Sequence, residues 1–238
     1  MISVVNVQQM LQLEAEAESH LEEHALMRTA AFGLYIEILN ILRTHFGSAQ
    51  RRSIVGLIGP GNNGSDALWA MSLLSRCGLK VSAIDTTQKR EQGFVDQLYT
   101  SSNGMWQSFE DMPDSIDLII DGIAGLRNNL APSDAVLDFV TAHPESLVVA
   151  VDMPSCFDND SATLIDADRV IVADYTVTFG YLKPCHVFNP ARSLCGDVIL
   201  VELPLAQVPE PVGQLMEPSD VSELLTELDI QSNKYTHG

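Results

Sequence analysis

The residues best suited to chemistry in this chain form one segment, Gly-Pro-Gly-Asn-Asn-Gly-Ser-Asp, at positions 59–66. The segment follows an apolar run at 53–58 that is typical of a strand, and it precedes an amphipathic helical pattern. A glycine-rich turn between a strand and a helix is a common ligand site in α/β proteins. Residues 59–64 also satisfy the G-x-G-x-x-G pattern, and Asp85 lies where dinucleotide folds keep the acid that binds ribose.

Three features of this segment argue against an ordinary diphosphate site. Pro60 removes one backbone N–H group. Asp66 places negative charge at the start of the helix, where a phosphate would bind. Asn62 and Asn63 put two carboxamides where plain spacer residues would serve. The segment is therefore suited to present amide groups and a carboxylate to a polar ligand.

Other polar residues follow apolar runs elsewhere in the chain, at Asp121, Asp152, Ser155 and Lys183. If the ends of these runs converge, they supply only oxygen ligands and hydrogen-bonding groups, which suit a hard monovalent cation or a polar ligand. Alternatively, each Asp caps a helix or turn after its strand. Lys183 could likewise donate to an amide, a phosphate or a leaving hydroxyl, or be a surface lysine in a turn.

Four segments, in this order, resemble those of the YjeF N-terminal family, the NAD(P)H-hydrate epimerases. Residues 59–66 are similar to the family's GPGNNGGDG loop, and residues 117–125 to its strand that ends in Asp before a glycine loop. Residues 149–155 resemble its VDIPSG turn, and residues 173–184 its ADxTVTFGxxKP signature. The matches span about residues 26–203. Some members of the family are the N-terminal part of a bifunctional epimerase and ADP-dependent dehydratase.

The resemblance implies a homodimer that acts on a small nucleotide substrate, the NAD(P)H hydrate, without a redox cofactor. It implies a potassium ion bound near Asn63, Asp121 and Ser155. It makes Asp152 and Lys183 the candidates for catalysis. The residues implied to contact the substrate are Asn62, Asn63, Gly64, Ser65, Asp66, Gly125, Leu126, Arg127, Asn128, Asn129, Leu130, Ala131 and Asp152.

The implied reaction interconverts the R and S hydrates at the nicotinamide C6 position, so that a dehydratase can repair both. Loss of hydroxide to an iminium-like species and re-addition of water would achieve this, with Asp152 as the acid and base. A ring-opening route is equally compatible with these residues. Two other functions compete: a catalytically weakened interaction or scaffold module, and an NAD-dependent dehydrogenase. The dehydrogenase ranks last because no second domain or hydride-transfer residues follow.

Several positions depart from the family's pattern. Ser65 and Ala67 stand where the family loop carries glycine, and Cys156 replaces the glycine that ends VDIPSG. Residues 125–129, Gly-Leu-Arg-Asn-Asn, replace a GTG-type loop. Each change adds side-chain bulk near the expected ligand, although Arg127 could pair with a phosphate. The substitutions therefore bear on whether the family's substrate fits this chain.

The pattern of apolar residues predicts how these segments are positioned. Residues 5–46 read as helices, and six strand-like runs follow, with helical patterns between the first four. This alternation favours a three-layer Rossmann-like α/β sandwich, with a mostly parallel central sheet and helices on both faces. The runs lie at 53–58, 80–84, 118–121, 147–151, 175–179 and 198–201, and the later helices at 66–77, 89–102 and 132–142.

A chain of 238 residues that is 46% hydrophobic is large enough for one substantial core, which we place in a domain at 1–203. Residues 204–238 contain several prolines and acidic residues, with a short helix expected at 219–228, and read as a tail or linker. The last six residues resemble the entry into a dehydratase domain; a tail without further structure is the alternative.

Charge and cysteine usage narrow the possible partners. The formal net charge is −19, which disfavours contact with nucleic acid or an anionic membrane surface. The four cysteines form no C-x-x-C pair, and the N-terminus lacks a basic segment followed by an apolar core. We therefore expect a cytoplasmic protein that binds neither nucleic acid nor membrane.

Overall fold

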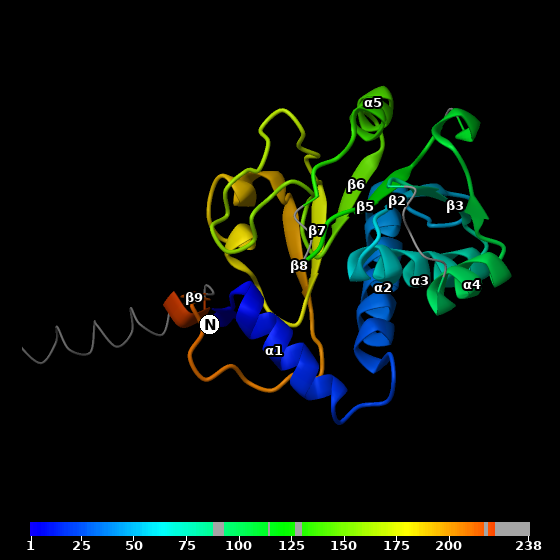
Figure 1. Ribbon diagram of the computed structural model, residues 1–238. Helices are drawn as coiled ribbons and strands as arrows, with labels where there is room; N and C mark the ends of the chain where they lie inside the picture. The colour runs from blue at the N-terminus through cyan, green and yellow to red at the C-terminus, as the bar shows by residue number, and fades with distance from the viewer. Residues whose placement is uncertain (88–92, 114, 127–129, 217–218, 222–238) are drawn as a thin grey trace, which may run out of the picture.

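The computed structural model of the chain describes all residues except 88–92, 114, 127–129, 217–218 and 222–238. Its centre is a seven-stranded sheet in the order β4-β3-β2-β5-β6-β7-β8, and each neighbouring pair is parallel (Figure 1). The strands are β2 (Ser53–Ile58), β3 (Lys80–Asp85), β4 (Met105–Trp106), β5 (Leu118–Gly122), β6 (Leu147–Val151), β7 (Tyr175–Phe179) and β8 (Asp197–Val201).

Helices cover both faces of this sheet. On one face lie α2 (Ala25–Phe46), α3 (Asn62–Arg76) and α4 (Phe94–Ser101), which share one buried apolar cluster with the strands. On the other face, α5 (Asp134–Ala142) and irregular segments form a second cluster. Three short 3-10 helices complete the elements, at Phe109–Asp111, Pro184–His186 and Ala191–Leu194. The prediction of a three-layer α/β sandwich with a parallel central sheet is confirmed.

The central strands are apolar throughout because both of their faces are covered. In β2, Ile54 and Ile58 pack in the cluster with α2 and α3, whereas Val55 and Leu57 point into the opposite cluster. All four side chains are fully buried. This two-sided burial explains why a continuous apolar run, rather than an alternating one, marks each of these strands.

Helix α2 buries its apolar face in the core. Leu34, Ile38 and Leu42 have no exposed surface, and their spacing of four residues places them on one side of the helix. By length and composition α2 is the one helix among the described residues apolar enough to cross a membrane. Its packing against the sheet gives its apolar side chains a partner within the fold.

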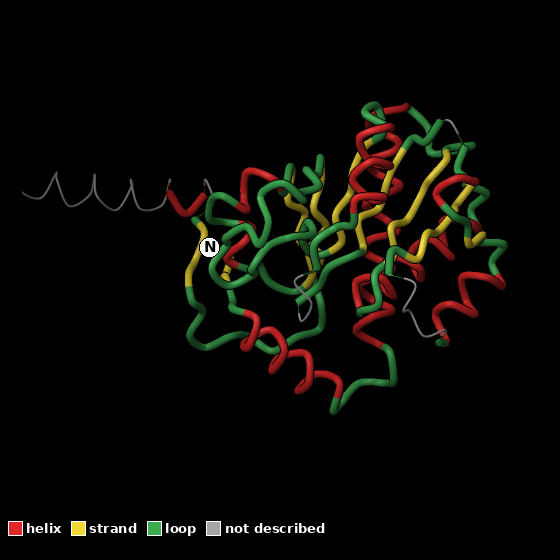
Figure 2. The backbone as a smooth tube through the Cα atoms, turned by 45° about the horizontal axis from the view of Figure 1, so that its top comes forward, coloured by secondary structure: helices red, strands yellow, loops and turns green. Residues whose placement is uncertain are grey.

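The N-terminal region contains more structure than the helical pattern predicted. Helix α1 (Val7–Glu18) is separated from α2 by turns, so the helical interpretation of residues 5–46 is wrong over 19–24. Before α1, strand β1 (Ile2–Val4) pairs antiparallel with β9 (Gly213–Leu215), which lies inside the segment we expected to be a tail. Figure 2 shows these two short strands beside α1, away from the large sheet.

Helix boundaries differ from the sequence prediction in two places. Helix α3 begins at Asn62, four residues before the expected start, because the extended backbone of Gly61 serves as its N-cap. Residues 62–65 are therefore the first turn of a helix and not a loop. The helix expected at 89–102 is described only from Phe94, and most of the one expected at 219–228 lies outside the described residues.

Candidate active site

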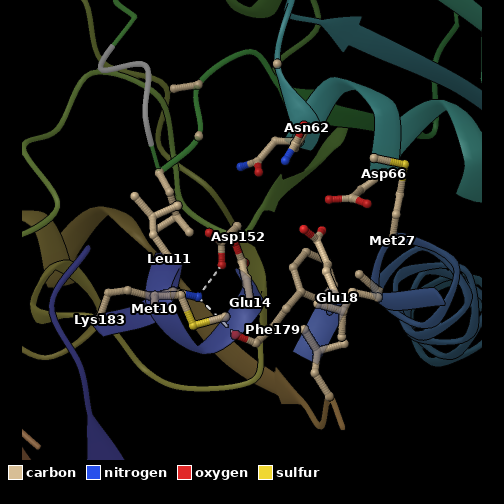
Figure 3. Close-up of a pocket in the computed structure, with 18 of the residues that line it drawn as sticks. Met10, Leu11, Glu14, Glu18, Met27, Asn62, Asp66, Asp152, Phe179 and Lys183 are labelled. Carbon is tan, nitrogen blue, oxygen red and sulfur yellow. Dashed lines mark hydrogen bonds and ion pairs between the residues drawn. The ribbon is translucent and has the colours of Figure 1, made fainter. Parts of the chain in front are cut away.

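The loops that follow β2, β5, β6 and β7 meet at one edge of the sheet because these strands are neighbours and parallel. They enclose a cavity of about 270 Å³, which helix α1 and the start of α2 close from the other side (Figure 3). Of the residues implied by the family resemblance, those that line this cavity are Asn62, Asn63, Asp66, Gly125, Leu126, Asp152 and Lys183.

A buried ion pair joins Asp152 and Lys183 at the cavity wall. The Lys183 side chain has no exposed surface, and its Nζ lies 2.5 Å from the Asp152 Oδ1. Its ammonium also donates to the Thr178 hydroxyl at 2.9 Å and to the Phe179 carbonyl at 3.1 Å. The Thr178 hydroxyl in turn donates to the same Asp152 oxygen at 2.8 Å. The three donors of the ammonium are therefore all used.

These contacts keep Asp152 ionised. Burial by itself would raise the pKa of the carboxyl, but the charge of Lys183, the electrostatic influence of the His186 imidazole and the hydrogen bonds from Lys183 and Thr178 outweigh burial and lower it. The backbone of Asp152 adopts a left-handed conformation with φ of 65°, and its N–H donates to the Val177 carbonyl at 2.8 Å. Such a conformation in a non-glycine residue fixes the direction of the side chain.

His186 supports the pair from behind. Its Nδ1 accepts the Lys183 backbone N–H at 3.0 Å, so Nε2 must carry the proton that it donates to the Asp152 carbonyl at 2.7 Å. Burial, followed by the nearby charge of Lys183, lowers the pKa of this imidazole to about 4. His186 is therefore a neutral positioning residue at pH 7.

The surroundings of Asp66 shift its pKa in the opposite direction. It lies on the second turn of α3, is 7% exposed and lines the cavity. Its Oδ1 has no hydrogen-bond partner among the described residues. Burial, and then the charges of Asp152 and Glu14, raise its pKa well above the ordinary value. One cavity thus holds one carboxyl whose pKa is lowered and another whose pKa is raised, an arrangement suited to paired acid and base chemistry.

A second polar cluster lies beside the cavity, at the ends of β5 and β6. The Asp121 carboxylate, 1% exposed, accepts the Ser155 hydroxyl at 2.7 Å, the Ser155 N–H at 3.0 Å and the Ile123 N–H at 3.2 Å. Burial raises the pKa of Asp121, and no described Lys or Arg pairs with it. The Asn63 carboxamide donates to the Val151 carbonyl at 2.7 Å. A β-carbon on Gly125 would lie 3.1 Å from the Asn63 Oδ1. A buried carboxylate among neutral oxygen groups fits a hard monovalent cation.

Glycine is required at two positions that bring the loops together. A β-carbon on Gly59 would lie 2.0 Å from the Ile123 carbonyl oxygen, and one on Gly64 would lie 2.3 Å from the Gly59 carbonyl oxygen. Gly64 therefore serves the close approach of helix and strand and does not line the cavity. Ser65, whose hydroxyl donates to the Gly61 carbonyl at 3.4 Å, does not line it either.

The remaining implied substrate contacts divide into two groups. Leu130 packs against the second apolar cluster and accepts the Cys156 N–H, and Ala131 is exposed; neither lines the cavity. Arg127, Asn128 and Asn129 lie outside the described residues.

Sequence reasoning missed several residues of the site. Glu14 and Glu18 line the cavity from α1, and Thr178 and His186 support the ion pair. The spacing of the two glutamates does place them on one helix face, but an acidic helix face is usually solvated. His186 follows Lys183 by three residues, a spacing that could have suggested it.

Comparison with known proteins shows the family to which the chain belongs. A family model described as YjeF-related protein N-terminus matches residues 23–185. The chain belongs to the YjeF N-terminal family.

Two relatives illustrate the range of YjeF N-terminal proteins that this chain resembles. It is 35% identical over 227 residues to a bifunctional NAD(P)H-hydrate repair enzyme Nnr of Mycobacterium tuberculosis, covering 94% of this chain and 46% of that protein. It is 33% identical over 196 residues to an NAD(P)H-hydrate epimerase of Clavibacter michiganensis, covering 76% of this chain and 82% of that one. The chain thus spans about half the length of the bifunctional relatives.

A solved structure supports the fold. The crystal structure of the yeast protein YNL200c superposes with a TM-score of 0.65 at 20% identity, covering 77% of this chain and 83% of that one. At this identity the likeness supports the fold and no residue role.

Of the positions where this chain departs from the YjeF N-terminal pattern, Leu126 lines the cavity, whereas Ser65, Ala67 and Cys156 do not. Cys156 has a φ of 84°, a conformation that favours the family's glycine, but its thiol contacts the Asp166 carbonyl and does not line the cavity. Ala67 is buried against Gly122. The added bulk of Ala67 and Cys156 is therefore accommodated outside the cavity.

Proposed function

We propose that this chain is an NAD(P)H-hydrate epimerase that interconverts the R and S hydrates of the reduced nicotinamide dinucleotides. One observation carries the proposal: the cavity holds Asp152, paired with buried Lys183, together with Asp66, whose pKa burial raises well above its ordinary value. Proton transfer to and from a hydroxyl needs such a pair. The names of the relatives from M. tuberculosis and C. michiganensis support the same reaction.

The chemistry begins at the ring carbon that bears the hydroxyl. Asp66 gives its proton to that hydroxyl, the C–O bond breaks, and its electron pair leaves with the oxygen as water. The lone pair of the ring nitrogen forms the new C=N bond, which makes the ring a cation. Water then adds to the opposite face and gives a proton to Asp152. Return of that proton from Asp152 to Asp66 resets the site, so atoms and charge balance.

Lys183 has two tasks in this proposal. Its charge keeps Asp152 ionised until water attacks. Its hydrogen bonds to Thr178 and the Phe179 carbonyl fix the ammonium, which in turn holds the Asp152 carboxylate in one position. Thr178 donates to the same carboxylate oxygen and His186 anchors the backbone of both residues. Preorganised contacts of this kind lower the cost of reorganisation during reaction.

We also propose a potassium site. Asn63, Asp121 and Ser155 would hold the ion through oxygen atoms, and the ion would supply positive charge beside the loops that bind substrate. The buried Asp121 carboxylate supports this proposal, since a cation would offset its charge. Melting in potassium chloride and in tetramethylammonium chloride tests it. We expect potassium to raise the melting temperature of the wild type but not of Asp121→Asn; an equal rise in both proteins would remove the site.

The larger organisation is part of the same proposal. We place the catalytic domain at residues 1–203 and take residues 204–238 as the connection to a dehydratase domain or partner, as the bifunctional relatives suggest. All four cysteines are free thiols, which suits a cytoplasmic protein.

We further propose a homodimer, as the family resemblance implied. The apolar face of α2 is buried in the core, so it is taken up within one copy of the chain. Exposed aromatic rings on the outer side of the helical layer offer another surface. Phe32 of α2 is 55% exposed and Phe94 of α4 is 53% exposed, where it meets Trp69 edge to face.

Separation of the two hydrate epimers by chromatography tests the activity. A single purified epimer incubated with the chain should reach equilibrium at least about a hundredfold faster than with the Asp152→Asn protein. If the folded wild-type chain does not accelerate the exchange, the epimerase proposal is wrong and an interaction module becomes the better description.

A further inference from the structure

The segment between β5 and α5 supplies part of the cavity wall without belonging to either element. Gly125 and Leu126 line the cavity, and both come from this segment. Its described parts, 123–126 and 130–133, belong to no helix and to none of the named strands. The position of this part of the wall therefore depends on contacts with neighbouring segments.

The loop that follows β6 makes several of these contacts. The Ala124 N–H donates to the Ser155 hydroxyl at 3.2 Å, and the Cys156 N–H donates to the Leu130 carbonyl at 3.1 Å. Leu126 packs against an apolar cluster to which the same loop contributes side chains. The loop after β6 thus supports the described parts of the segment from the side away from the cavity.

Arg169 adds a contact from the far end of the loop after β6. One terminal nitrogen of its guanidinium donates to the Pro132 carbonyl at 2.9 Å, and the other lies 2.5 Å from the Asp134 carboxylate at the start of α5. Its Nε lies 3.7 Å from the carboxylate of Asp166 in its own loop. Each nitrogen of the guanidinium therefore has a partner, and the fork joins the two loops.

The contact with Pro132 distinguishes this arrangement from an ordinary surface ion pair. The Asp134 side chain is 81% exposed, and an ion pair with so exposed a partner contributes little by itself. Pro132 is buried, so a hydrogen bond to its carbonyl fixes backbone that packs within the fold. Arg169 does not line the cavity, so it can influence a ligand there through the segment that it holds.

We propose that Arg169 is a positioning residue for the cavity wall, which holds the segment between β5 and α5 so that Gly125 and Leu126 keep their places. The inference rests on the proposed function for the identity of the substrate, an NAD(P)H hydrate. A wall that is ordered in advance spares the substrate the cost of ordering it. Loss of the anchor should therefore weaken substrate binding more than it slows proton transfer at Asp152.

Hydrogen exchange of single amides, followed by NMR, tests the anchor without turnover. Arg169→Ala should speed exchange of the Cys156 N–H at least about fivefold, because the Leu130 carbonyl that accepts it is less well held. The Asp152 N–H, which donates to the Val177 carbonyl at 2.8 Å, is the internal control and should change less than about twofold. Equal exchange of the Cys156 N–H in variant and wild type would overturn the proposal.

Kinetics with one purified epimer of NADH hydrate tests the positioning role. Arg169→Ala should raise KM about three- to tenfold and leave kcat within about twofold. Arg169→Lys keeps the charge but has one nitrogen in place of three, so its KM should lie between those of wild type and Arg169→Ala. Arg43→Ala is the matched control, because it removes the same charge from an exposed residue of α2 that does not line the cavity. Its KM should stay within about twofold of the wild type.

Three kinetic results would overturn the positioning role. The first is an unchanged KM in Arg169→Ala. The second is an Arg169→Lys protein that behaves as the wild type, since charge alone would then suffice. The third is a lower kcat with unchanged KM, which would indicate a general disturbance of the site. If the wild type does not exchange the epimers, the proposed function fails, and exchange of the Cys156 N–H alone decides whether Arg169 anchors the segment.

Discussion

The buried position of Lys183 decides between two interpretations of this residue. The sequence left two interpretations open, a surface lysine in a turn or a group that acts on the ligand. The structure places its ammonium inside the fold, against Asp152, Thr178 and the Phe179 carbonyl. A buried ion pair is costly to form and more costly to break, because removal of one partner leaves the other charged and unpaired. Asp152 and Lys183 are therefore one unit for stability as well as for chemistry.

The Asp152→Asn substitution should expose this coupling. The variant leaves the Lys183 ammonium buried without a counter-charge, and we expect it to lose about 3–5 kcal/mol of unfolding free energy. The double variant Asp152→Asn with Lys183→Met should recover most of that loss, because it leaves no buried charge. Both should exchange the epimers at least about a hundredfold more slowly than the wild type. Urea denaturation measures the stabilities, and a single variant as stable as the wild type would contradict the buried pair.

His186 predicts a dependence of stability on pH. Its pKa falls from the ordinary 6.5 to about 4 in the fold, so between these values the unfolded chain binds a proton that the folded chain does not. The free energy of unfolding therefore decreases as the pH falls through this range, by about 2 kcal/mol at pH 5 relative to pH 7 from this group. This contribution is fully present above pH 6.5.

The His186→Gln protein is the control for this pH dependence. Glutamine has no proton to gain, so the stability difference between wild type and variant should be about 2 kcal/mol smaller at pH 5 than at pH 7. Chemical denaturation at both values checks it. A difference that does not change with pH would mean that the fold leaves the pKa of His186 at its ordinary value.

At the scale of elements, features marked by a local sequence pattern could be predicted, and features that depend on tertiary placement could not. The runs at β2, β6 and β7 were predicted to the residue, because burial on both faces leaves a continuous apolar signal. Strands β1 and β9 have three residues each and pair across about 210 positions, so neither carries a signal of its own. The polar groups at strand ends were predicted because the strands that they follow were predicted. Glu14 and Glu18 were not, since only the position of α1 brings them to the cavity.

The capping box of α1 offers a test at this scale. Asn6 accepts the Gln9 N–H at 2.8 Å, and the Gln9 side chain accepts the Asn6 N–H at 3.1 Å. Asn6→Ala should cost about 1 kcal/mol of unfolding free energy, because the Gln9 N–H at the start of α1 loses its partner. Asn40→Ala, in the middle of α2 and exposed, should be neutral or slightly stabilising. Unchanged stability in Asn6→Ala would mean that the box does not hold α1.

At the scale of the whole molecule, negative charge and exposed rings lie on different parts of the fold. Helix α1, which carries Glu14 and Glu18, lines the cavity, and β1 with β9 and the Gln9–Glu210 hydrogen bond tie this region to the residues after β8. The outer side of the helical layer instead exposes Phe32 and Phe94, with His24 stacked on Phe94 at 5.5 Å. With a formal charge of −19, two copies repel unless they meet through a surface of low charge. The aromatic surface is the better candidate for an interface between copies.

Light scattering at about 10 µM tests this interface, a concentration at which a stable dimer of standard interface size stays associated. The wild-type chain should have twice the 26.0 kDa of one copy, and Phe32→Glu should have the mass of a single copy, because a charge buried without a partner opposes association. Phe188→Glu is the matched control, since that ring is 56% exposed on a segment after β7 and should leave the dimer intact. A wild-type chain with the mass of one copy would contradict the dimer. A dimer that persists in Phe32→Glu but not in Phe188→Glu would place the interface at the opposite end of the sheet.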